Sequence, residues 1–109
     1  MIMYGGQKEE HAKRLRTFAD KLEESAALAR AAATDAFNAA LEGGDYKTKL
    51  DEARAAIADA DESLAEMRKS LNFGSSPDSA ARLMSAVPAY HAAIIYIETT
   101  AQHIALLQK

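Results

Sequence analysis

Between residues 50 and 71, apolar side chains recur at alternating steps of three and four residues: Leu50, Ala53, Ile57, Ala60, Leu64, Met67 and Leu71. A 3.5-residue repeat is typical of coiled-coil packing, in which one stripe of a helix faces a neighbouring helix. The same repeat returns near the C-terminus, at Ala80, Leu83, Val87, Tyr90, Ile94, Ile97, Ala101 and Ile104. Two such repeats predict helices that pack side by side.

Helix is the only regular structure that this chain favours, because alanine occurs 25 times and the few glycines and prolines stand mostly at boundaries. Gly43-Gly44 should end the first helix, Asp45 or Thr48 should cap the second, and Pro77 should begin the third behind Ser76. Short connections make consecutive helices antiparallel neighbours. We therefore expect one all-α domain over residues 1–109, an antiparallel up-down-up three-helix bundle with helices at about 7–42, 46–71 and 77–108.

The first helix has its own apolar stripe, and the second half of that stripe is nearly all alanine. Its members are His11, Leu15, Phe18, Leu22, Ala26, Ala29, Ala33, Ala36 and Ala40. Small side chains let a neighbouring backbone approach to an interaxial distance of about 8 Å. Three long helices with such small contacts predict a rod that buries little area per residue.

Residues 83–97 carry no formal charge, in a chain whose first two thirds are rich in charge of both signs. On a helical projection, a second apolar group lies roughly 60 to 120° from Ile94. It comprises Met84, His91, Ile95 and Leu106. A helix that is apolar over most of its circumference is normally central in a larger bundle. We therefore expect a partner on this side, either a second copy, which makes a symmetric six-helix dimer, or another helical protein.

Pro88 interrupts the third helix and removes one backbone hydrogen bond, which predicts a kink near residues 84–87. The kink either bends the helix around the bundle or opens a small pocket. Glu98 is expected to be half-buried and to need a cross-helix partner, for which Arg30 is the suggested residue. The candidate interface or pocket residues are Met84, Pro88, Tyr90, His91, Ile95, Glu98, Gln102 and Leu106.

Catalytic, cofactor and metal sites are not predicted. The chain has no cysteine, and none of its histidines has a second histidine four residues away or a glutamate three residues before it, the spacings of helical metal ligands. A net charge of −3 with mixed signs argues against nucleic-acid binding, and the uncharged run of 15 residues is too short for a membrane span. Residues 1–6 do not resemble a signal peptide, so we expect a cytoplasmic protein.

These observations favour a non-enzymatic protein-interaction module, an adaptor, regulator or structural subunit that acts as a homodimer through the third helix. One alternative is a small-ligand sensor or small helical enzyme with a pocket at Pro88. A second alternative is a subunit of a hetero-oligomer, in which the same face docks on a different protein.

Overall fold

The computed structural model describes residues 3–72 and 77–108, with the side chains of all these except residues 3–9, 11, 12, 70–72 and 79. Three helices form a rod of 66 × 18 × 15 Å: α1 (Met3–Leu41), α2 (Tyr46–Asn72) and α3 (Pro77–Leu107). The predicted helix bounds agree to within one residue, except that α1 begins at Met3 and includes Gly5 and Gly6. Glycine weakens a helix by about 1 kcal/mol per residue without forbidding it.

The connection from α1 to α2 follows the predicted capping chemistry. Gly43 adopts a left-handed φ of 76°, and the amide of Gly44 donates to the carbonyl of Ala39 at 2.7 Å, which closes a Schellman-type end. Asp45 then caps α2, because its carboxylate accepts from the Thr48 amide at 3.2 Å and from the Thr48 hydroxyl at 2.6 Å. These bonds, the hydroxyl bond first, lower the pKa of Asp45.

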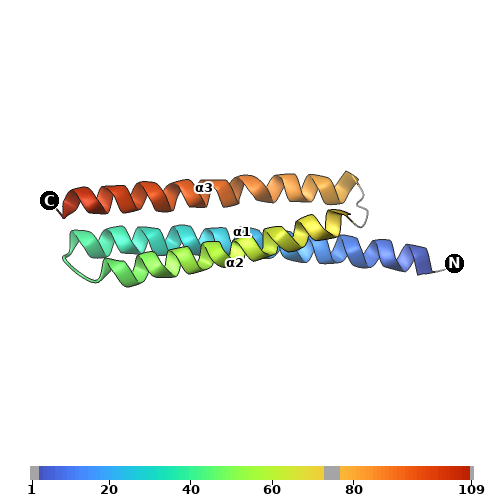
Figure 1. Ribbon diagram of the computed structural model, residues 1–109, viewed down its shortest axis with the longest axis horizontal. Coiled ribbons are helices and arrows are strands. Elements are labelled where there is room, and N and C mark those ends of the chain that lie inside the picture. Colours follow the sequence, from blue (N-terminus) through green and yellow to red (C-terminus); the bar gives the residue numbers. More distant parts are fainter. Residues whose placement is uncertain (1–2, 73–76, 109) are drawn as a thin grey trace.

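α1 is the helix that holds the other two together. It packs along both α2 and α3, whereas α2 and α3 touch each other only sparsely. Figure 1 shows the chain passing up, down and up along the rod, so that α1 and α3 run in the same direction. The structure therefore confirms an all-helical, up-down-up arrangement.

The core is a single row of three clusters along the rod. One end has the larger side chains of Leu15, Leu22 and Met67; the middle is almost all alanine; the other end includes Leu50 and Ile104. On α2 the predicted stripe is buried or half-buried at every position up to Met67, while Leu71 lies outside the described side chains. On α1 the stripe is also confirmed, with half-buried Phe18 and with Ala19 as an addition; His11 lies outside the described side chains.

Every position of the contact line predicted for α3 is buried or half-buried, but the most deeply buried side of the helix is rotated away from that line. Of the predicted positions only Ile97 and Ile104 are buried, and the other buried residues of α3 are Ala86, Ala93 and Thr100. Small side chains allow α3 to approach the alanine-rich stripe of α1 closely. The larger residues of the predicted line, such as Leu83 and Tyr90, are only half-buried beside this contact.

Candidate functional site

Arg82 anchors the start of α3 to α1. Its guanidinium donates to Asp20 Oδ1 at 2.6 Å and also donates to Glu23, and both acids come from α1. Hydrogen bonding to Asp20, and next to Glu23, raises the pKa of Arg82. A third hydrogen bond, to the hydroxyl of Ser85 at 3.0 Å, ties the guanidinium to its own helix. The charge of Arg82 is therefore paired with acidic groups of the same subunit.

Two tyrosines set the rotation of α3 about its own axis. Tyr90 donates its hydroxyl to Asp61 of α2, and this bond, followed by burial, raises the pKa of Tyr90. Tyr96 bonds to the Thr34 hydroxyl of α1 at 2.6 Å. Since Thr34 donates its own hydrogen to the Arg30 carbonyl at 3.1 Å, Tyr96 is the donor in that pair. With these two tyrosines turned toward α2 and α1, the opposite side of α3 faces away from the bundle.

That opposite side carries seven of the eight predicted site residues, all of them exposed. We call it the outer face of α3: Met84, Pro88, His91, Ile95, Glu98, Gln102 and Leu106. Met84, Ile95 and Leu106 are 73%, 64% and 65% exposed, and with Leu107 they make four of the six large apolar side chains exposed among the described residues. The structure thus places these residues on one helix surface, while Tyr90 lies on the other side against α2.

Two expectations about polar residues on α3 are corrected. Glu98 is exposed instead of half-buried, so it needs no neutralising partner within the subunit. Arg30 does not approach it: the guanidinium lies over the ring of Tyr96, 5.2 Å from its centre. The angle estimate failed for Glu98 because the contact line of α3 is rotated away from that residue. α3 continues as one helix through Pro88, whose ring is exposed.

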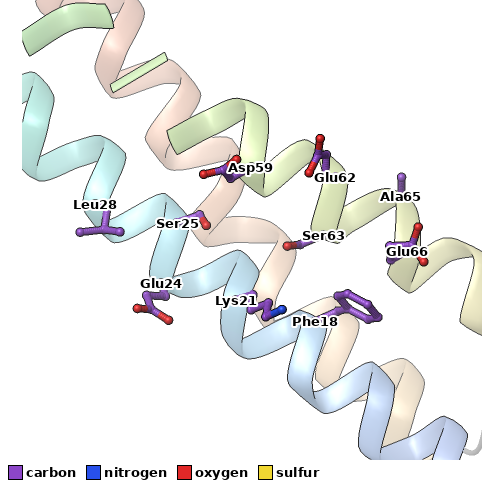
Figure 2. Close-up of a pocket in the computed structure, with 10 residues that line it drawn as sticks. All are labelled: Phe18, Lys21, Glu24, Ser25, Leu28, Asp59, Glu62, Ser63, Ala65 and Glu66. Atoms are coloured by element: carbon purple, nitrogen blue, oxygen red, sulfur yellow. The ribbon is translucent and has the colours of Figure 1, made fainter. Parts of the chain in front are cut away.

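A groove that the sequence did not indicate lies between α1 and α2, with a volume of about 650 Å³. Figure 2 shows Ser25 and Ser63 between the two helices, with acidic side chains around them. The only cation in the lining is Lys21, whose ammonium lies 5.7 Å from the centre of the Phe18 ring. The groove is lined by Phe18, Lys21, Glu24, Ser25, Leu28, Asp59, Glu62, Ser63, Ala65 and Glu66.

The groove and the outer face differ in what they can do chemically. Four carboxylates line the groove, yet the part of the chain that the structure describes contains no group of three or more residues arranged to hold a metal ion. Within residues 3–72 and 77–108, no helix combines the length and apolar character that crossing a bilayer requires. The outer face combines exposed apolar side chains with the polar groups of His91, Glu98 and Gln102, a mixture that protein interfaces also show.

Comparisons with known proteins add no relative. No family model, no curated protein and no solved structure matches the chain. The outer face is therefore interpreted from its own residues.

Proposed function

We propose that this chain is a non-enzymatic protein-interaction module, an adaptor, regulator or structural subunit, that acts as a homodimer through the outer face of α3. One observation carries the proposal. Met84, Ile95 and Leu106 are at least 64% exposed along one side of a helix that has no charge between Arg82 and Glu98. A helix face that exposes several large apolar side chains is a candidate interaction surface.

The geometry of the polar groups supports binding in preference to catalysis. His91, Glu98 and Gln102 are exposed and are spread over eleven residues of one helix, about 16 Å along its axis. A general base must come within about 3 Å of its proton donor, or act through one water. Side chains spaced in this way suit contacts with a second long surface better than the surrounding of one small substrate.

A second copy of α3 is the simplest partner, because a homodimer forms without any other protein. In a twofold dimer the same patch of each subunit covers the other, so one exposed face is sufficient. The long, straight rod leaves the outer face open along its length (Figure 1). Pairing there would bury the apolar side chains that the alanine-rich core leaves outside.

Solution mass measured by light scattering tests this proposal. The unmodified protein should have twice the mass of the 11.7 kDa chain. Ile95→Glu should convert it to a folded monomer, since burial of an unpaired carboxylate costs several kcal/mol. Leu28→Glu is the matched control, because Leu28 is similarly exposed, at 59%, but lies on α1 at the groove.

Two results would count against the homodimer. A monomeric mass of the unmodified protein, with helicity intact, would leave the outer face to a different protein, as in a hetero-oligomer. An Ile95→Glu variant that keeps the dimeric mass would show that the dimer forms elsewhere. Circular dichroism of both variants checks that the helices are retained.

A further inference from the structure

The outer face of α3 is symmetric about Ile95. Met84 precedes it by eleven residues and Leu106 follows it by eleven. Eleven residues are just over three helical turns, so the three side chains form a nearly straight line with about 16 Å between neighbours. All three are exposed.

We infer that two copies of α3 pair antiparallel across a twofold axis at Ile95. In this register Ile95 packs against its own copy, and Met84 packs against the partner's Leu106 at both ends. The inference rests on the proposed function, because it assumes that the outer face is the dimer interface. It adds the direction and register of the two helices, which the proposed function leaves open.

Hydrogen-bond complementarity supports the antiparallel direction. Glu98 lies three residues after Ile95 and His91 four residues before it, so in the antiparallel pair Glu98 and the partner's His91 differ by only about 1.5 Å along the axis. Both side chains lie roughly 40 to 60° to the same side of the Ile95 line. Because the twofold axis is perpendicular to both helices, these side chains of the two copies lie on the same side of the helix pair. Each carboxylate therefore accepts a hydrogen bond from an imidazole N–H of the other subunit.

The parallel alternative leaves Glu98 without His91. Its twofold axis runs along the helices, so the two Glu98 carboxylates share one level on opposite sides of the pair, and the partner's His91 lies about 10 Å away along the axis. Among the described residues, the salt bridges do not include Glu98, so its carboxylate remains available for the partner. The antiparallel direction pairs this acid, and the parallel direction does not.

Pro88 and Gln102 fit the same register. Pro88 lies seven residues before Ile95 and Gln102 seven residues after it, so they also stand opposite each other in the antiparallel pair. Proline has no N–H to offer the carbonyl of Met84 one turn earlier. The side-chain amide of the partner's Gln102 can donate to that carbonyl. Every residue of the outer face then has a counterpart at its own level.

Engineered cysteines test the direction, since the chain has no natural cysteine. A disulfide needs Cβ atoms about 4 Å apart. Met84→Cys and Leu106→Cys proteins, mixed to exchange subunits and then mildly oxidised, should form the mixed disulfide. Neither variant should cross-link with itself, because in the antiparallel pair the two copies of position 84 are about 33 Å apart. Intact mass distinguishes the mixed product from the self-linked ones.

The outcomes separate the inference from the proposed function. A dimeric mass with the mixed disulfide alone supports both. A dimeric mass with a self-linked Met84→Cys product, or with no cross-link, overturns the antiparallel register and leaves the α3 dimer to the Ile95→Glu test. A monomeric mass of the unmodified protein overturns both.

Discussion

Replacing Ala29 with leucine tests whether the alanine-rich middle of the rod is closely packed. Ala29 is fully buried, in the cluster that also contains Ala53 of α2 and Ala93 of α3. If space were available there, the three added carbons would stabilise the protein by about 2 kcal/mol, at ~0.8 kcal/mol for each buried methylene. In a well-packed site the same carbons force the helices apart and typically cost about 1 to 3 kcal/mol. The two cases differ in sign.

We expect Ala29→Leu to destabilise the protein by about 2 to 3 kcal/mol. Ala31→Leu is the control, because Ala31 is exposed on the same helix and its change should stay within about 0.5 kcal/mol. Urea unfolding followed by circular dichroism measures both. With a slope of about 1 to 3 kcal/mol per molar urea, the midpoint of Ala29→Leu should fall by roughly 0.7 to 3 M. Both proteins are compared at one concentration, because association adds stability by mass action. An unchanged or higher midpoint would refute close packing of α1 against its neighbours.

Two further predictions concern α1 and the start of α2. Leu22→Ala should lower the stability by about 3 to 4 kcal/mol, because this side chain is fully buried. Leu28→Ala is the control, since Leu28 is 59% exposed and its loss should be less than about 1 kcal/mol. Equal losses in urea unfolding would contradict the burial assigned to the two leucines. Asp45 has a lowered pKa in the folded state, so its contribution is complete well above 3.8, the ordinary value, and is lost as the pH falls through the folded pKa. On acidification from neutral pH to below 3.8, the unmodified protein should thus lose more thermal stability than the Asp45→Ala variant does. Identical losses would mean that the bonds from Thr48 do not favour the ionised carboxylate.

Periodicity alone predicted the contact stripes of α1 and α2, because polar residues on the other sides of those helices leave one apolar line. It did not fix the rotation of α3, where apolar residues occupy most of the circumference. There the size of the facing side chains decides. The alanines of α1, such as Ala29 and Ala33, accept the small residues Ala86 and Ala93 of α3 at close range. To predict the rotation of α3, one must know which helix faces it and which residues lie at the same position along the rod. The repeat of a single helix does not contain this information.

Cross-helix polar contacts were unpredictable for the same reason. The sequence suggests Arg30 as the partner of Glu98, yet Arg30 lies over the ring of Tyr96. Tyr96 precedes Glu98 by two residues, about half a helical turn, and so lies on a different side of α3. Arg82 did carry a signal, since it is the only arginine or lysine of α3, but its acidic partners on α1 could not be selected from sequence alone. The groove between α1 and α2 also depends on how the two helices align, which places Ser25 and Ser63 in one lining.

The rotation of α3 links the core to the proposed interface. Because Ala86, Ala93 and Thr100 occupy the contact with α1, the opposite side of the helix is left with Met84 and Ile95. Had the larger residues faced α1, α1 and α3 would have been held further apart, and the close alanine contacts between them would have been lost. Close packing within one subunit therefore places bulky apolar side chains at its surface. An antiparallel α3 pair would bury those side chains, so that the large residues excluded from the α1–α3 contact would join two subunits.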